Sequence, residues 1–268
     1  MPSVKFDFSS RVALVTASSR GIGFAVARML AQAGADVCIC ARTPESVKQA
    51  EKDLRALPNH PKILALAGDI GSDVFIRSIL PELRREFGRG PDILITNSGG
   101  PPPGEILKLT DDQWLEALRR NLLSVVSLCT LAAPEMIERK FGRIVNLTST
   151  LAKEPDKGMA LSSVARAGVA AFTKTLSREL GPHGITANTI LTGGCQTERF
   201  QKLVQGSLAS TGETYDQAVQ RISAGIPVGH VSTPEEFARI VAFFASDEAS
   251  YLTGTAAAID GGASRSVF

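Results

Sequence analysis

Aromatic residues and cysteines are scarce in this chain of 268 residues, which contains two tyrosines, one tryptophan and four cysteines. The cysteines stand at Cys38, Cys40, Cys129 and Cys195, and their spacing matches neither a disulfide framework nor a zinc site. We therefore expect reduced thiols, no bound metal and a cytoplasmic protein. Cys195 lies in a predicted loop, where it is also a candidate ligand contact.

No charge of one sign is in excess, because 29 basic residues stand against 27 acidic ones for a net charge of +2. This balance argues against a nucleic-acid partner and against an anionic membrane surface. No run reaches the roughly 18 apolar residues of a membrane span, and the first residues, MPSVKFDFSS, lack an apolar core with a cleavage site. We expect a soluble protein with a small-molecule substrate.

No Pro/Gly/Ser-rich linker and no charge run divides the chain, so we expect one domain over residues 1–268. Short apolar runs alternate with segments of helical spacing. Strands are expected at 12–15, 36–40, 63–66, 92–96, 143–148, 185–190 and 256–259, and helices at 24–33, 45–57, 72–87, 111–139, 159–180 and 234–245. The alternation predicts an α/β fold, a doubly wound parallel sheet (Rossmann fold) in three α/β/α layers. Residues 198–229 are irregular and mixed in polarity, and we expect a mobile substrate lid there.

A turn with two glycines joins the first strand to the first helix. It reads Thr16-Ala17-Ser18-Ser19-Arg20-Gly21-Ile22-Gly23. Unpaired N–H groups and the helix dipole favour anions at a helix start, so this turn is expected to hold the pyrophosphate of a dinucleotide. An ordinary strand–helix turn is the alternative for this segment taken alone.

Arginine stands near the position that selects the cofactor. In a dinucleotide fold, an acidic residue about 20 positions beyond the glycines holds the ribose 2′-OH, whereas an arginine accommodates a 2′-phosphate. Here Ala41 occupies that position, Arg42 follows it, and Arg20 lies in the glycine loop. We therefore expect NADP(H) to be preferred over NAD(H); the alternative is that both arginines are solvated surface residues.

The third and fourth strands also end in polar residues. Asp69-Ile70 follows the third strand, where the carboxylate can accept from an adenine amino group or cap the helix that starts at Ser72. Asn97-Ser98-Gly99 follows the fourth, and prolines in 101–104 stiffen a loop consistent with a pocket rim. Ligands in such sheets bind beyond the carboxyl ends of the strands, so these segments are expected to share one site.

The stretch 142–174 is the first place to look for chemistry. Its strand ends in Thr148-Ser149-Thr150, and the following helix carries Ser162 and Arg166, four residues apart on one face. A hydroxyl beside a guanidinium can bind sugar hydroxyls or a developing oxyanion. The pair offers no obvious proton donor.

Together these segments resemble the short-chain dehydrogenase/reductase family over essentially the whole chain, in the branch that includes the 3-oxoacyl-[acyl-carrier-protein] reductases. TASSRGIG is similar to the family's TGxxxGxG loop, with Ala17 in place of the first glycine, and NSGG at 97–100 is similar to its NNAG strand end. The ending SYLTGTAAAIDGG resembles the family's C-terminal strand. The resemblance implies that Thr192-Gly193, in place of the usual Pro-Gly, and Thr197 contact the cofactor.

The resemblance also implies four catalytic positions, of which two differ from the family pattern. Asn121 falls at the family's helix asparagine and Ser149 at its catalytic serine, while the YxxxK positions hold Ser162 and Arg166. In a standard member the tyrosine protonates the carbonyl oxygen, and the lysine lowers the tyrosine's pKa and holds the nicotinamide ribose. Arginine stays protonated and cannot act as a proton shuttle; it can keep the ribose contact and the positive field, but a serine should not replace the phenol.

If proton transfer is retained, the candidate donors are Lys153, Lys157, Tyr215 and water, although a solvated loop lysine is the ordinary interpretation of Lys153.

Three functions follow from the resemblance. The first is an NADP(H)-dependent reductase of a 3-oxoacyl-ACP or other ketone, with Ser149 polarising the carbonyl. A variant reduces an activated C=C bond, and the third is an NADP-binding protein without turnover.

Family members commonly form tetramers through the helix at 159–180, so we expect a homo-oligomer (tetramer or dimer); an intramolecular packing face is the alternative.

Overall fold

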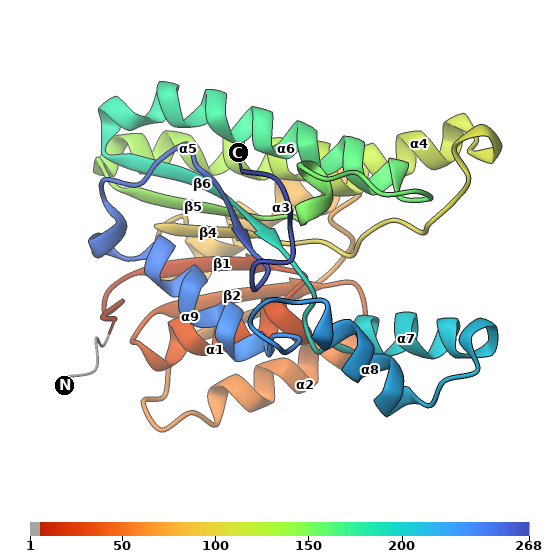
Figure 1. Ribbon diagram of the computed structural model, residues 1–268. Coiled ribbons are helices and arrows are strands. Elements are labelled where there is room, and N and C mark those ends of the chain that lie inside the picture. Colours follow the sequence, from red (N-terminus) through yellow and green to blue (C-terminus); the bar gives the residue numbers. More distant parts are fainter. Residues whose placement is uncertain (1–5, 268) are drawn as a thin grey trace.

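A seven-stranded parallel sheet forms the centre of the computed structural model, which describes residues 6–267 (Figure 1). The strands lie in the order β3-β2-β1-β4-β5-β6-β7. Their bounds are β1 Val12–Thr16, β2 Asp36–Ala41, β3 Ile63–Ala67, β4 Ile93–Thr96, β5 Gly142–Leu147, β6 Ile185–Thr192 and β7 Ala256–Ile259. The chain runs outward from β1 to β3 on one side and from β4 to β7 on the other. This order confirms the predicted doubly wound sheet.

Helices cover both faces of the sheet, as Figure 1 shows, with α1, α2 and α9 on one face and α3, α5 and α6 on the other. Their bounds are α1 Gly21–Gln32, α2 Pro44–Arg55, α3 Asp73–Phe87, α5 Ser124–Arg139, α6 Ala160–Leu180 and α9 Pro234–Ala245. Successive side chains of β1 point to opposite faces of the sheet, so they pack into both helical layers. Ala13 and Val15 join the core with α1 and α9, whereas Val12 and Leu14 join the core with α3, α5 and α6. The predicted three layers are confirmed.

The predicted helix at 111–139 is present, but it is not regular throughout. Between α4, Asp111–Leu118, and α5 lies a π-helical segment, Arg119–Leu123. By length and composition the stretch Asp111–Arg139 could cross a membrane. Its α5 part packs against β4, β5 and α6, so its apolar side belongs to the protein core.

Residues 198–229 are more regular than the sequence indicated. They contain two helices, α7 Glu198–Thr211 and α8 Tyr215–Ala224, which Figure 1 shows beyond the carboxyl ends of the strands. The side chains of Thr197 and Thr214 cap them by accepting backbone N–H groups. The prediction of an irregular segment was wrong because the described buried apolar residues of these helices are Val204 and Ala218 alone. One fully buried residue in each helix means that neither helix carries a wide apolar stripe.

Candidate active site

The end of β1 is tied to its neighbours by hydroxyl groups. Thr16 Oγ1 donates to the carbonyl oxygen of Asn97 at 2.7 Å and accepts from the N–H of Asn97 at 2.7 Å. Ser18 Oγ donates to Val15 O at 2.6 Å and accepts from Cys40 N at 3.1 Å. Both side chains are buried. Thr16 and Ser18 therefore anchor the glycine loop, and any contact they make with a cofactor is additional to this role.

The first turn of α1 is left open toward an anion. Gly21 has a φ of +57°, and a Cβ on Gly23 would lie 2.4 Å from the carbonyl oxygen of Ala17. Arg20 occupies the N-cap without a side-chain capping bond, so no side chain of the loop competes for the N–H groups of this turn. This arrangement fits a dinucleotide pyrophosphate.

The two arginines near the loop differ in their surroundings. Arg42 is exposed, and among residues 6–267 no acidic side chain pairs with it. Arg20 Nη1 instead pairs with Glu198 of α7 at 2.7 Å. Thr197 also lies against the loop, because its Cγ2 is 3.3 Å from the position of a Cβ on Gly21. Helix α7 therefore begins directly beside the glycine loop.

Asp69 does not cap the next helix. Ser72 occupies the N-cap of α3, and its side chain accepts from Phe75 N at 3.4 Å. The Asp69 carboxylate accepts from Gly71 N at 2.9 Å and pairs with Arg120 at 2.6 Å. The capping alternative was wrong because Ser72 already accepts the backbone N–H at the start of α3. Contacts of Asp69 and its neighbour in the chain with adenine stay predictions.

The asparagine inside the long helix is buried and not a solvated polar position. Asn121 is 4% exposed and lies in the π-helical segment. Its Nδ2 donates to Ala117 O at 3.1 Å, and its Oδ1 accepts from Ser98 Oγ at 2.9 Å. This bond ties the helix to the loop after β4. Such π segments often mark functional sites, but no periodicity in the sequence revealed this one, and only the family resemblance pointed to Asn121.

The loop after β6 is also fixed by backbone groups. Thr192 Oγ1 donates to Thr148 O at 2.7 Å, and Gly193 N donates to Ile259 O at 2.9 Å. These bonds join β5, β6 and β7 at the edge of the sheet where the other segments meet. Contacts of Thr192 and Gly193 with a cofactor stay predictions.

Ser149 follows β5 and lies at the start of a short 3₁₀ helix, Thr150–Ala152. Its Oγ accepts from Leu151 N at 3.3 Å. The 3₁₀ helix packs against α6, the helix that carries Ser162 and Arg166. The fold thus brings the predicted strand-end serine next to the helix of the predicted Ser/Arg pair.

Arg166 is a buried cation, and no carboxylate of residues 6–267 pairs with it. It is 8% exposed, and its Nε donates to Ser162 Oγ at 3.1 Å. Within the part of the chain that the structure describes, its two terminal nitrogens have no hydrogen-bond partner. Burial, and then the charge of Arg199, lower the pKa of Arg166 to about 10. The guanidinium still carries its charge at neutral pH, where it can stabilise a negative charge on a ligand.

The structure supplies no phenol or ammonium group bonded to this pair. Lys153 and Lys157 are exposed, and Tyr215 is partly exposed at the start of α8. Among residues 6–267, none of these three side chains hydrogen-bonds to Ser149, Ser162 or Arg166. Cys195 is buried, and burial raises the pKa of its thiol to about 11, so it behaves as a core thiol.

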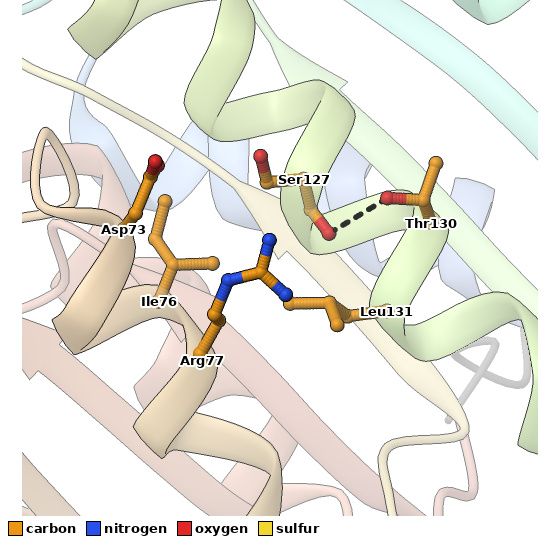
Figure 2. A pocket seen from close by; sticks show the side chains of 6 residues that line it. All are labelled: Asp73, Ile76, Arg77, Ser127, Thr130 and Leu131. Carbon is orange, nitrogen blue, oxygen red and sulfur yellow. Dashed lines mark hydrogen bonds between the residues drawn. The ribbon is translucent and has the colours of Figure 1, made fainter.

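Figure 2 shows a small surface cavity between α3 and α5, away from the predicted residues. It is lined by Asp73, Ile76, Arg77, Ser127, Thr130 and Leu131. The dashed line marks the bond of the Thr130 hydroxyl to the carbonyl of Ser127, 3.1 Å, which satisfies that hydroxyl within its own helix. None of the predicted site residues lines this cavity.

Comparisons with known proteins agree with this fold. A family model described as enoyl-(acyl carrier protein) reductase matches residues 16–264. The 3-oxoacyl-[acyl-carrier-protein] reductase FabG of Vibrio cholerae is 34% identical over 256 residues, which cover 96% of this chain and 98% of that protein. The NADPH-dependent reductase BacG of Bacillus subtilis is 30% identical over 259 residues, covering 97% and 100%.

A solved structure is also similar to this chain over nearly its full length. It is the NADPH-bound structure of a short chain oxidoreductase from Pseudomonas aeruginosa PAO1, described as containing an atypical catalytic center. It is 31% identical with a TM-score of 0.89, and the match covers 98% of this chain and 100% of that one. Because these matches span almost the whole chain and share its fold, the chain belongs to the short-chain dehydrogenase/reductase family.

Proposed function

We propose that this chain is an NADPH-dependent oxidoreductase that reduces a carbonyl compound, and that Ser162 and Arg166 occupy the family's tyrosine and lysine positions. The observation that carries the proposal is the buried Arg166 guanidinium, bonded to Ser162 Oγ and free of any described carboxylate. A positive charge held in place, without an acid that neutralises it, suits an oxygen on which negative charge develops. The relative described as having an atypical catalytic center supports a departure from the family pattern.

The residues of the chain fit the proposed cofactor. The uncapped start of α1 leaves the N–H groups of Gly21, Ile22 and Gly23 for the pyrophosphate, and the exposed Arg42 is the cation for a 2′-phosphate. Two of the three similar proteins described above are named for NADPH. When bound, NADPH supplies the hydride.

Further contacts with the cofactor are proposed for a serine of the glycine loop and for residues at the ends of β3, β4 and β6. They are Ser19, Asp69, Ile70, Asn97, Ser98, Gly99, Thr192, Gly193 and Thr197, together with Arg166 at the ribose. Their place at the carboxyl edge of one parallel sheet supports this assignment, because ligands of such sheets bind there.

The side chains of the site divide the work on the substrate. Ser149 donates its hydroxyl hydrogen to the carbonyl oxygen, and Arg166 with Ser162 stabilises the negative charge that builds up on this oxygen. Asn121 holds the loop after β4 in place through its bond to Ser98. A solvent water, rather than a fixed phenol, is the simplest proton source, since no described lysine or tyrosine bonds to these residues. We also propose that α7 and α8 form a lid over the substrate.

A reductase of an activated C=C bond is the second candidate, and the same guanidinium favours it. Reduction of such a bond leaves an enolate, whose oxygen needs a stabilising cation and whose carbon takes a proton in a later step. A fixed acid beside the oxygen is then less important. A protein that binds NADP without turnover is the remaining alternative, because loss of general acid catalysis alone removes about 10² to 10⁴ in rate.

We propose in addition a cytoplasmic homo-oligomer that assembles through α6. Ala167 and Ala171 are exposed on this helix and small enough for close contact between helices. The four cysteines are free and buried, as expected in a reducing compartment.

The proposed function is tested by single-turnover assays of the purified protein with NADPH. A panel of ketones is compared with a panel of enones, and cofactor affinity is titrated in parallel. Oxidation of NADPH with either panel supports a reductase, and the faster panel identifies the bond. Tight NADPH binding without oxidation on any substrate, and without gain on Ser162→Tyr combined with Arg166→Lys, contradicts the proposal and leaves a binding protein.

A further inference from the structure

A second guanidinium reaches the loop after β4 from α7, where Arg199 Nη1 donates to Gly100 O at 2.9 Å. Arg199 stands in the first turn of α7, and its positive charge is one of the two causes that lower the pKa of Arg166. Arg199 is exposed to solvent, which screens its charge, so an anion gains more from direct contact with this guanidinium than from relief of repulsion between the two cations. The pair therefore favours a negatively charged ligand over a neutral one.

Backbone carbonyls, and not a carboxylate, hold Arg199 in place. Its Nη1 donates to Gly100 O at 2.9 Å, and its Nη2 lies 3.5 Å from Pro101 O. Carbonyl oxygens orient the guanidinium but leave its charge uncompensated. The missing side chain of Gly100 makes this approach possible, because a Cβ there would lie 2.8 Å from Nη2 of Arg199.

The acidic residues of neighbouring segments are engaged with other groups. Glu198, next in the chain to Arg199, pairs with Arg20 at 2.7 Å. Asp260, at the end of β7, accepts from the backbone N–H groups of Gly262 and Ser264, both at 2.9 Å. Among residues 6–267 no carboxylate pairs with either guanidinium, so neither positive charge is neutralised by a described acid.

We propose that Arg199 is a specificity-determining residue that binds a carboxylate of the substrate, so that the enzyme acts on oxo acids or unsaturated oxo acids. This inference rests on the proposed function, in which Arg166 faces the oxygen of the reacting group. One of the two positive charges then meets that oxygen, and the remaining one matches a singly charged carboxylate better than a doubly charged phosphate. A guanidinium also matches a carboxylate in shape, since it can donate two parallel hydrogen bonds.

Matched acids and esters test this assignment. NADPH oxidation is measured with levulinate and methyl levulinate, and with acetylacrylate and its methyl ester, which differ in charge but not in the reacting group. In whichever acid/ester pair the wild-type enzyme reduces, the acid is expected to have a kcat/KM about tenfold or more above that of its ester. Arg199→Gln is expected to abolish this preference by raising KM for the acid, with little change for the ester.

Two further variants separate the position of the charge from its amount. Arg221→Gln removes the same charge from the lid, but Arg221 pairs with Glu213 at 2.8 Å, so this variant keeps the acid preference. Gly100→Ala retains the charge of Arg199 and displaces its guanidinium, so this variant loses most of the preference.

The Arg199 assignment and the reductase proposal fail in different ways. If no compound is reduced, calorimetric titration of the protein with NADP⁺ present still compares acid and ester, and the acid is expected to bind to the wild type but not to Arg199→Gln. An ester that serves as well as its acid, an acid preference that survives Arg199→Gln, or binding of neither compound overturns the assignment. Absence of NADPH oxidation across the ketone and enone panels overturns only the reductase.

Discussion

Arg166 Nε donates a hydrogen bond to Ser162 Oγ at 3.1 Å, across one turn of α6, and both residues lie on the buried face of this helix. A serine oxygen is a weak partner for a full positive charge that is only 8% exposed. The protein keeps a charge where burial disfavours it. Charged groups held in this way are typical of functional sites.

Replacing Arg166 by methionine is therefore expected to stabilise the protein while it removes activity. Methionine fills a similar volume without a desolvated charge, so the free energy of unfolding should rise by about 1–3 kcal/mol. Turnover should fall at least about a hundredfold, because the charge no longer stabilises the substrate oxygen. Urea unfolding and NADPH oxidation measure the two effects. A variant that is both inactive and less stable would assign Arg166 to the packing of α6.

The backbone at Ala17 gives a second prediction. Ala17 has a φ of +46°, a left-handed conformation that costs an L-residue roughly 1–2 kcal/mol. Ala17→Gly should relieve this strain, and after the greater freedom of glycine in the unfolded chain is subtracted, the net gain should be up to about 1 kcal/mol. Thermal or urea unfolding of the free protein measures it.

A matched control is Ala56→Gly, at the C-terminal cap of α2. Ala56 has a φ of −77°, so glycine relieves no strain there and should destabilise the protein by about 0.5–1 kcal/mol. Equal losses of stability in the two variants would show that Ala17 is not strained.

Cofactor selection gives a third prediction. Arg42→Ala should weaken NADPH by about 10- to 100-fold and NADH by less than about twofold, because only NADPH carries the 2′-phosphate that the guanidinium is proposed to bind. Fluorescence titration with both cofactors measures the ratio. Arg77→Ala, an exposed arginine of α3 beside the cavity of Figure 2, is the control and should change neither affinity. Similar losses for both cofactors would remove Arg42 from the site.

The sheet and its helices were predictable because their signals are local. A buried parallel strand such as β1 is a short apolar run, and a turn or glycine ends it, so seven strands and their helices could be placed from spacing alone. The edge of the sheet that carries the site followed from the parallel order. Helices α7 and α8 were missed because each buries a single described apolar residue, Val204 or Ala218.

Relationships within the site could be predicted only in part. Ser162 and Arg166 lie four apart on one helix, so their contact follows from helical geometry. The bond between Asn121 and Ser98 depends on a π segment that no sequence pattern revealed. The contact of Arg199 with Gly100 depends on how α7 returns to the loop after β4, which is a property of the tertiary fold.

The ion pair between Arg20 and Glu198 gives the last prediction. It joins the glycine loop to α7 at 2.7 Å, and both side chains are more than half exposed, at 63% and 56%. In this state Glu198 places a negative charge beside the loop proposed to hold the cofactor phosphates. Glu198→Gln removes this charge and frees Arg20 for a phosphate. NADPH should therefore bind about 1.5- to 5-fold more tightly, the range expected for an exposed pair of about 0.2–1 kcal/mol.

Salt and a second lid variant distinguish this effect from a change in the lid itself. The gain in NADPH affinity should shrink as ionic strength rises, because exposed charges are screened within about 8 Å at physiological salt. Glu213→Gln removes an equal charge from the lid, where Glu213 pairs with Arg221 at 2.8 Å and not with the glycine loop, and should leave NADPH affinity unchanged. Weaker binding of NADPH to Glu198→Gln would mean that the ion pair holds the lid closed over the cofactor. The contact would then act mainly through the position of α7, and its charge would be secondary.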